Sequence, residues 1–167
     1  MPVENFLSKN IKRKIVSLSA GQTKKIGERL AKQLLAKSNN DSAVVIGLQG
    51  ELGAGKTTFL QGFARGLGIK EKITSPTFVL MKRFEIPQQA IKMSRCNYRN
   101  FYHLDCYRIE QPSEILTLGW QDIINNPKNI IAIEWPEKIK NALPKNTFWF
   151  RFKLIGKSKN TRAITAL

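Results

Sequence analysis

Apolar residues along the chain follow two kinds of spacing, which predict alternating strands and helices. Residues 43–48 and 129–134 are short, mostly apolar runs rich in β-branched side chains, as expected of buried strands. Residues 58–67 carry apolar side chains at helical spacing and are followed by a glycine suited to a helix C-cap. An earlier helix is predicted to start with a capping box at Ser19 and to end near residues 38–41. Strands and helices that alternate in this way favour an α/β fold.

Strict alternation identifies another strand near the end of the chain. Over residues 147–154 the phenylalanines share one face, and Trp149, Arg151 and Lys153 share the other. A strand with one apolar and one polar face is typical of a half-buried antiparallel strand. We expect it to pair with residues 162–167.

Weaker patterns predict the remaining elements. The strands expected from short apolar clusters are residues 12–18, placed at a sheet edge, 78–84 and 101–104. A helical stretch over residues 112–126 is interrupted at Gly119. Residues 85–100 show no periodicity and carry several cations, so we expect a basic loop there.

The segment between the first buried strand and the following helix matches the phosphate-binding pattern G-x-x-x-x-G-K-[ST]. Its residues are Gly50, Glu51, Leu52, Gly53, Ala54, Gly55, Lys56 and Thr57, followed by Thr58. Glycines allow the backbone to wrap an anion with its N–H groups pointing inward, and the helix N-terminus adds positive charge. Lys56 can reach the β- and γ-phosphates of a nucleotide, and the Thr57 hydroxyl can ligate Mg²⁺. The sequence therefore predicts a nucleoside triphosphate site.

This strand–loop–helix unit narrows the fold class. We predict a three-layer P-loop NTPase with a mixed sheet, whose strands are parallel at the centre and antiparallel at the edges. The length of 167 residues suits one domain, residues 1–167, with residues 85–100 as a basic insertion. The sequence shows no internal repeat and no boundary between domains.

Two carboxylates follow apolar segments of the predicted sheet. Glu134 ends the second buried strand, and Trp135 and a proline after it stop the strand. A P-loop needs an acid on a neighbouring strand to hold the metal and polarise water, so Glu134 is the candidate Walker B residue. An acid at a strand end can also cap the next helix. Asp105 follows residues 101–104 and is either a second site carboxylate or a turn-forming aspartate.

The composition is strongly basic. The chain has 28 Lys and Arg against 12 Asp and Glu, a formal net charge of +16. Such an excess favours a polyanionic neighbour such as RNA. The cations are spread along the chain, so a generally basic surface is the alternative interpretation. Lys92, Arg95 and Arg99 lie in the predicted basic loop, where they either steer RNA or simply face solvent.

The composition also bears on cellular location. No apolar run approaches the length of a membrane span, and the first ten residues lack the basic and apolar regions of a signal peptide. Cys96 and Cys106 show neither metal-ligand spacing nor a C-x-x-C motif, so we interpret them as free thiols. We expect a cytoplasmic protein with no membrane association.

Four sequence blocks occur in series: Gly50–Phe59, Thr74–Phe78, His103–Arg108 and Ile133–Glu137. Together they resemble the TsaE (YjeE) family, small ATPases needed for the threonylcarbamoyl modification of adenosine in ANN-decoding tRNAs. The phosphate-binding pattern alone is common to many families, whereas four blocks in the family's order are specific. The resemblance implies ATP and Mg²⁺ as cofactors and TsaD- and TsaB-type proteins as partners. It also implies that tRNA is contacted indirectly, through their complex.

The resemblance assigns roles that spacing alone does not. The Ser-Pro-Thr-Phe block behaves as a switch-like segment in the family, which makes Ser75 and Thr77 switch residues and Thr77 a sensor of the γ-phosphate and Mg²⁺. The block with His103, Asp105 and Arg108 lies beside the nucleotide and the partner surface in the family. On the sequence alone, the single histidine fits a structural role better; with the resemblance, a structural and a functional role are equally compatible with it.

The fourth block completes the expected site. Glu134 corresponds to the family's acidic Mg²⁺-site residue and Trp135 to the tryptophan next to the nucleotide. The resemblance and the phosphate-binding pattern together make Lys56, Glu134 and Asp105 the expected catalytic residues. Thr57 and Glu134 are the expected metal ligands.

Three other functions fit parts of the sequence. A small-molecule kinase needs a lid with phosphate-pairing arginines; residues 85–100 are the only candidate lid, and they show no such arrangement. A GTPase has less support, because no N-K-x-D or D-x-x-G signature follows the phosphate-binding pattern. A nucleotide-regulated RNA-binding protein is suggested by charge alone. The sequence identifies no arginine finger with certainty, and Arg108 is the best internal candidate. We therefore expect an ATPase that is slow until a partner completes the site.

Overall fold

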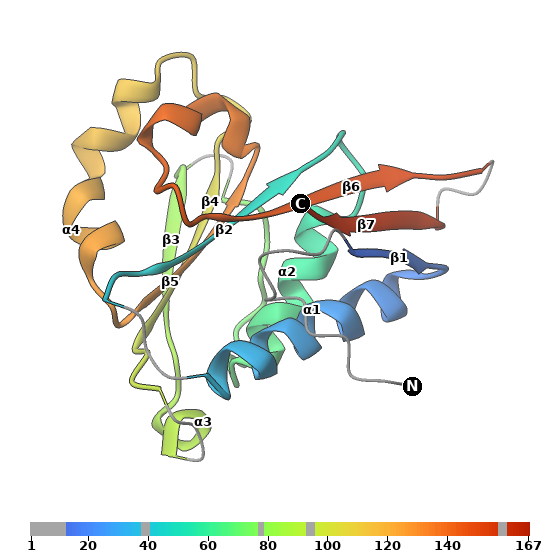
Figure 1. Ribbon diagram of the computed structural model, residues 1–167, viewed down its shortest axis with the longest axis horizontal. Helices are drawn as coiled ribbons and strands as arrows, with labels where there is room; N and C mark the ends of the chain where they lie inside the picture. The colour runs from blue at the N-terminus through green and yellow to red at the C-terminus, as the bar shows by residue number, and fades with distance from the viewer. Residues whose placement is uncertain (1–12, 38–40, 77–78, 93–95, 157–159) are drawn as a thin grey trace.

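Seven strands form one sheet in the structure, a computed structural model that describes residues 13–37, 41–76, 79–92, 96–156 and 160–167 (Figure 1). The strands are β1 (Arg13–Ser17), β2 (Val44–Gln49), β3 (Met81–Glu85), β4 (Asn100–Asp105), β5 (Asn129–Glu134), β6 (Phe148–Leu154) and β7 (Arg162–Ala166). The helices are α1 (Ala20–Leu35), α2 (Lys56–Gly66), α3 (Gln88–Lys92) and α4 (Trp120–Asn125), with 3₁₀ helices η1 (Pro112–Leu118) and η2 (Pro136–Ala142). The strand order is β1-β7-β6-β2-β5-β4-β3.

The centre of the sheet is parallel and its edges are antiparallel. β2 pairs in parallel with β5 and β6, and β5 pairs in parallel with β4. β3 runs antiparallel to β4 at one edge, while β7 and β1 form the antiparallel other edge. This arrangement confirms the predicted mixed sheet. One detail was wrong: β6 is antiparallel to β7, as expected, but parallel to β2.

Helices cover both faces of the central strands, which gives three layers (Figure 1). α1 and α2 pack on one face, over a core that includes Phe59, Phe63 and Phe101. η1, α4 and η2 cover the other face, over a second core that includes Trp120 and Ile133. The predicted three-layer α/β architecture is therefore confirmed.

Glycines bring α1 and α2 close together. A Cβ at Gly27 of α1 would overlap the Phe59 carbonyl oxygen of α2, and one at Gly62 would overlap the Lys24 carbonyl oxygen. Both positions therefore need glycine because the two backbones touch there. The contact holds α2, and with it the loop at the N-terminus of α2, against the rest of the structure.

The predicted long helices are present with shifted ends. The Ser19 hydroxyl accepts a hydrogen bond from the Gln22 N–H at 3.2 Å, but the Gln22 side chain accepts from the Leu18 N–H at 2.7 Å instead of from Ser19 as in a full capping box. α1 ends at Leu35, before the predicted end, and α2 begins earlier than predicted, at Lys56. No helix within the described residues is both long and apolar enough to cross a membrane.

Two predictions for the region after α2 were wrong. The strand expected at residues 78–84 begins only at Met81, because the residues before it form a turn in which Leu80 has a φ of 61°. Phe78 lies outside the described residues. Residues 85–100 are not a loop throughout, since they contain α3. A five-residue helix is too short to leave a periodic apolar pattern.

The two ends of the parallel strands carry different features. β2, β5 and β4 run in the same direction, so their carboxyl ends lie at the same end of the sheet. Glu134 and Asp105 lie in register there. The segment after β3 connects Glu85 to Asn100. These two residues pair with each other at the opposite end of the sheet, where β4 begins. Within this segment, the described residues 85–92 and 96–100 therefore lie away from the phosphate-binding pattern and are not placed to act as a kinase lid.

Candidate active site

The phosphate-binding pattern forms a tight loop between β2 and α2, called the phosphate loop below. Gly50, Gly53 and Gly55 have φ values of 144°, 78° and 97°, in the region that favours glycine. A Cβ at Gly50 would also overlap the Phe152 carbonyl oxygen of β6. Gly55 is the N-cap of α2 and has no side chain to bond the first-turn N–H groups. These N–H groups are therefore available to an anion at the helix N-terminus.

Lys56 lies folded against the phosphate loop. Its side chain is buried, and its Nζ donates hydrogen bonds to the Gly50 carbonyl oxygen at 2.6 Å and the Glu51 carbonyl oxygen at 2.9 Å. The Nζ also lies 4.3 Å from the centre of the Trp135 ring, a cation–π contact. A phosphate in the loop would offer this ammonium a full negative charge in place of two carbonyl dipoles.

The surroundings of Lys56 favour a negatively charged ligand. Burial lowers the pKa of Lys56, and the carboxylates of Glu134, Asp105 and Glu137 oppose that shift. Because desolvation is the largest of these influences, the charged lysine lacks part of the stabilisation that water would give it. A polyanion that enters the loop restores that stabilisation.

Glu134 connects the phosphate loop to two strands of the sheet. It is the last residue of β5 and is 4 % exposed. Its Oε1 accepts a hydrogen bond from the Thr57 hydroxyl at 2.8 Å and lies 3.0 Å from His103 Nε2. Thr57 belongs to the first turn of α2 and His103 to β4. Contacts from α2 and from β4 therefore hold the Glu134 carboxylate on two sides, at the carboxyl end of β5.

His103, in the block predicted to lie beside the nucleotide and the partner surface, is a buried neighbour of Glu134 and is not itself exposed. The ring is 0 % exposed, and its Nδ1 has no hydrogen-bond partner within the described residues. A neutral ring that donates from Nε2 satisfies this geometry, because a proton on Nδ1 would be buried without an acceptor. His103 therefore orients the Glu134 carboxylate.

Thr57 and Glu134 suit a magnesium ion that arrives with a nucleotide. They place a hydroxyl oxygen and a carboxylate oxygen together beside the phosphate loop, and hard oxygen ligands are those that Mg²⁺ prefers. Across the described parts of the chain, no group of three or more His, Cys, Asp or Glu could hold a metal alone. Mg²⁺ typically takes one or two carboxylates and completes its shell with phosphates and water, so this pair fits it.

Asp105 combines the two roles between which the sequence did not decide. It ends β4, is 6 % exposed and lies in register with Glu134. One carboxylate oxygen accepts a hydrogen bond from the Ser75 hydroxyl, and the other accepts from the Tyr107 N–H at 3.0 Å. The second bond is that of an Asx turn. Asp105 therefore shapes a turn and also places a carboxylate in the site.

These groups line one cavity of about 360 Å³ that contains residues from all four sequence blocks. The lining residues are Leu52, Gly53, Gly55, Lys56, Thr57, Thr58, Ser75, Asp105, Tyr107, Arg108, Glu134 and Trp135. The predicted site is thus largely brought together in space. Tyr107 was not among the predicted site residues, although its place inside the third block was a signal that could have identified it.

Aromatic rings form one wall of this cavity. Trp135 has a φ of 59°, which is unusual for a residue other than glycine, at the point where β5 gives way to η2. Its ring lies over Lys56 and 5.2 Å from the ring of Tyr107. Strained backbone of this kind is frequent at ligand sites. Tyr107 and Arg108 are exposed and form the outer rim.

Some predicted residues lie elsewhere. Ala54 is buried beneath the loop and does not line the cavity, and Thr77 lies outside the described residues. Behind the loop, Arg162 of β7 is buried with its guanidinium against Gly55. No sequence motif indicates this contact, because it joins two segments that are far apart along the chain.

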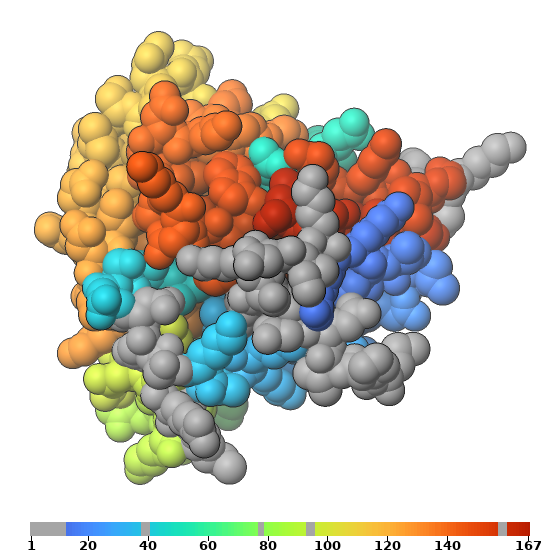
Figure 2. Space-filling view, in the orientation of Figure 1, coloured from blue at the N-terminus to red at the C-terminus, as the bar shows by residue number. Residues whose placement is uncertain are grey.

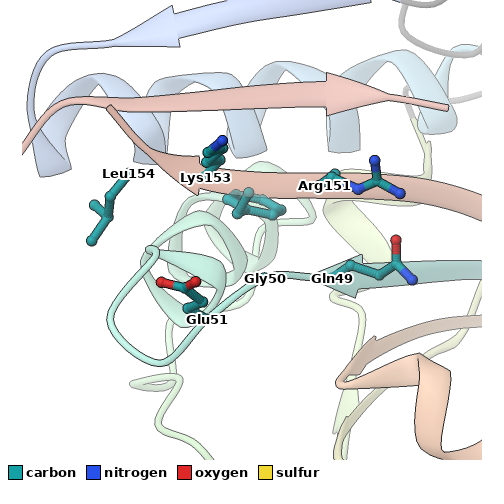
Figure 3. Close-up of a pocket in the computed structure, with 7 residues that line it drawn as sticks. Gln49, Gly50, Glu51, Arg151, Lys153 and Leu154 are labelled. Carbon is teal, nitrogen blue, oxygen red and sulfur yellow. The ribbon is translucent and has the colours of Figure 1, made fainter. Parts of the chain in front are cut away.

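A second hollow of about 340 Å³ adjoins the phosphate loop where β2 and β6 end (Figure 3). It is lined by Gln49, Gly50, Glu51, Arg151, Phe152, Lys153 and Leu154. Gln49 and Arg151 occupy paired positions of β2 and β6 and lie side by side in Figure 3. Gly50 and Glu51, predicted to contact the nucleotide, line this hollow and not the larger cavity.

Comparisons with known proteins cover most of the chain. Residues 17–164 match the family model of the threonylcarbamoyl adenosine biosynthesis protein TsaE. The tRNA threonylcarbamoyladenosine biosynthesis protein TsaE of Treponema pallidum is 34 % identical over 140 residues, which are 84 % of this chain and 90 % of the relative. The protein of the same name from Nostoc sp. is 42 % identical over 110 residues, 64 % of this chain and 60 % of the relative. The crystal structure of Bacillus subtilis YdiB has a TM-score of 0.68 and 28 % identity, covering 93 % of this chain and 84 % of that one.

Proposed function

Because the chain belongs to the TsaE family of threonylcarbamoyl adenosine biosynthesis proteins, we propose that it serves this tRNA modification as an ATP hydrolase. The hydrogen bond of 2.8 Å between Thr57 and Glu134 carries the proposal. It joins the hydroxyl of the phosphate-binding motif to the acid at the end of the adjacent parallel strand. Phosphoryl transfer in P-loop enzymes needs this pair of groups beside the phosphates.

Each polar group of the site has a separate role in the proposed reaction. The N–H groups of the phosphate loop and Lys56 hold the β- and γ-phosphates of ATP. Thr57 and Glu134 would hold Mg²⁺, which would neutralise phosphate charge when bound. His103 keeps Glu134 in position, and Asp105 faces the same cavity as a second carboxylate that orients the attacking water.

Partner proteins of the TsaD and TsaB type would regulate this site. Arg108 is the one arginine that lines the cavity within the described residues, and it lies on the exposed rim. A cavity whose buried lining residues include no arginine gains from a positive group supplied by a partner, which can accelerate phosphoryl transfer by about 10³-fold or more. Tyr107 and Arg108 are the rim residues that such a partner would contact. The protein would bind this complex, and through it encounter tRNA, in the cytoplasm.

ATPase assays on the purified protein test this proposal. We expect slow hydrolysis of ATP by the protein alone and a rise of about tenfold or more when TsaD and TsaB are both added. The Lys56→Ala protein should stay inactive in both conditions, and GTP in place of ATP measures nucleotide preference. Absence of hydrolysis in every combination would contradict the proposal. Rapid turnover that the partners leave unchanged would contradict the regulatory part of it.

A further inference from the structure

Acidic residues are absent from one end of the sequence. The last of them is Glu137, and residues 138–167 contain eight Lys and Arg but no Asp or Glu. This segment forms β6 and β7. β1, which pairs with β7, has an arginine and a lysine and again no acidic residue. Figure 2 shows β1, in blue, beside the strands of the C-terminal segment, in red. The antiparallel end of the sheet is therefore built without a single carboxylate side chain.

The strand register lines up one row of polar side chains across this end of the sheet. Lys14 of β1 pairs with Thr165 of β7, Thr165 pairs with Arg151 of β6, and Arg151 pairs with Gln49 of β2. Paired residues project from the same face of a sheet. Because neighbouring strands lie about 4.8 Å apart, the row is about 14 Å long. It ends at Gln49, directly before the phosphate loop.

Trp149 and Lys153 flank this row on the same face. Residues two apart in a strand lie on one face at a spacing of about 6.7 Å, so Trp149, Arg151 and Lys153 form a stripe along β6. Arg151 and Lys153 are exposed and Trp149 is half-buried. The Trp149 ring lies close against Gly47 of β2, which holds it in place at the start of the stripe. We call Lys14, Trp149, Arg151 and Lys153 the β6 face.

The β6 face leads into the second hollow beside the phosphate loop. Gln49, Arg151 and Lys153 line this hollow, and Figure 3 shows Arg151 and Gln49 projecting to the same side. Glu51 is the one carboxylate among its lining residues. A flexible polyanion on the β6 face would thus reach the rim of the nucleotide site without entering it.

We infer that the β6 face binds the phosphate backbone of RNA. Its cations are spaced along and across the strands, and no carboxylate of β1, β6 or β7 opposes them. A tryptophan in line with two cations adds a ring on which a base can stack, as in surfaces that bind single-stranded nucleic acid. An acidic protein would use the cations but would leave the aromatic ring without a function. The inference does not depend on ATP hydrolysis, because the face and the phosphate site share no side chain.

The basic segment at the other edge of the sheet provides a matched comparison. Lys92 and Arg99 are also exposed, and they lie in the segment between β3 and β4, away from the phosphate loop. Replacing them removes the same amount of charge as replacing Arg151 and Lys153. A difference between the two double variants therefore reports on the position of the charges and not on the net charge.

Binding of a fluorescent, unmodified tRNA transcript to the full chain, without nucleotide, tests the inference. Each phosphate contact contributes about 0.7 to 0.9 to the slope of log K against log salt concentration. The variant Arg151→Gln/Lys153→Gln should therefore have a slope lower by about 1.4 to 1.8 and at least about fivefold weaker binding at low salt. The control Lys92→Gln/Arg99→Gln should keep the wild-type slope. Circular dichroism confirms that both variants are folded.

A second variant separates stacking from charge. Trp149→Ala should weaken binding of a single-stranded oligouridine by about fivefold or more, whereas Trp149→Phe should retain most of it, because a ring is kept. Equal losses in the two double variants, or a loss in neither, would overturn the inference. It would also be overturned if Arg151→Gln/Lys153→Gln bound tRNA normally but no longer bound TsaD and TsaB, since the face would then serve a protein.

Discussion

The phosphate site and the β6 face differ in the surroundings of their charged side chains. Lys56, Glu134 and Asp105 are buried, and hydrogen bonds to named neighbours hold each of them. Arg151 and Lys153 are exposed, and neither forms an ion pair within the described residues. The two regions are nevertheless adjacent, since the second hollow has residues of both the phosphate loop and β6 in its lining.

This difference determines how substitutions should act in each region. A buried charge that loses its partner is left uncompensated, which lowers the free energy of unfolding by about 3 to 5 kcal/mol. Exposed charges act through their sum and are screened by salt. Changes in the site should therefore be large and specific to one contact, and changes on the β6 face should be graded and dependent on salt.

Glu134→Gln is the strongest test of the buried region. The amide keeps the size of the side chain but removes its negative charge, so we expect kcat for ATP to fall by about 10²- to 10³-fold. The dissociation constant for ATP, measured by calorimetry, should change by less than about fivefold, because the acid acts mainly on metal and water. Lys56→Ala, in contrast, should lose binding as well as hydrolysis. Equal hydrolysis by wild type and Glu134→Gln would refute the assignment of this acid.

His103→Ala should give the next largest effect. It removes a buried hydrogen bond to Glu134 and leaves a cavity, so we expect a loss of about 1 to 3 kcal/mol in the free energy of unfolding. We also expect about a tenfold lower kcat with little change in KM, because Glu134 is less well oriented. His103→Gln, which keeps a donor, should recover much of kcat. A kcat that does not differ between the alanine and glutamine variants would show that His103 is only structural.

Cys106 provides a third comparison, because burial keeps its thiol uncharged beside the active site. Burial, aided by the Asp105 carboxylate, raises the pKa of the Cys106 thiol to about 12. The unfolded chain loses this proton near the ordinary thiol pKa, so stability is full below that value and declines as pH rises above it. At pH 9.5 the loss should be about 1 kcal/mol.

Urea unfolding at pH 7.5 and pH 9.5 measures this decline. In the Cys106→Ala protein, the decline in stability between pH 7.5 and pH 9.5 should be smaller by the contribution of this thiol, whatever the absolute stability of the variant. Cys96→Ala is the matched control, since Cys96 is also a buried thiol. Identical pH dependence in wild type and Cys106→Ala would contradict the prediction.

The parallel centre was predictable because local pattern and motif agree there. β5 has the predicted bounds, and β2 differs from its prediction by one residue at each end. Short apolar runs that are rich in β-branched residues and bounded by turn residues favour a buried strand over a helix. The acid at the end of β5 followed from the same reasoning, since parallel strands end at a common edge.

The features that were missed depend on contacts between distant segments. Alternation in β6 indicated which side chains share a face but not that β2 would pair with it in parallel. The burial of His103 against Glu134 and the contact of Arg162 with Gly55 likewise join separate elements. Such pairs leave no periodic signal, because nothing in the spacing of one segment encodes its neighbour.

During synthesis β1 leaves the ribosome long before β7, its partner strand. The register joins Ser17 to Arg162 and Arg13 to Ala166, so the edge of the sheet closes only when the end of β7 is available. Until then β1 has no strand to satisfy its backbone groups, and β6 presents an open edge next to the phosphate loop. A nascent chain stalled before residue 162 should therefore be a substrate for chaperones and proteases rather than a partly active enzyme.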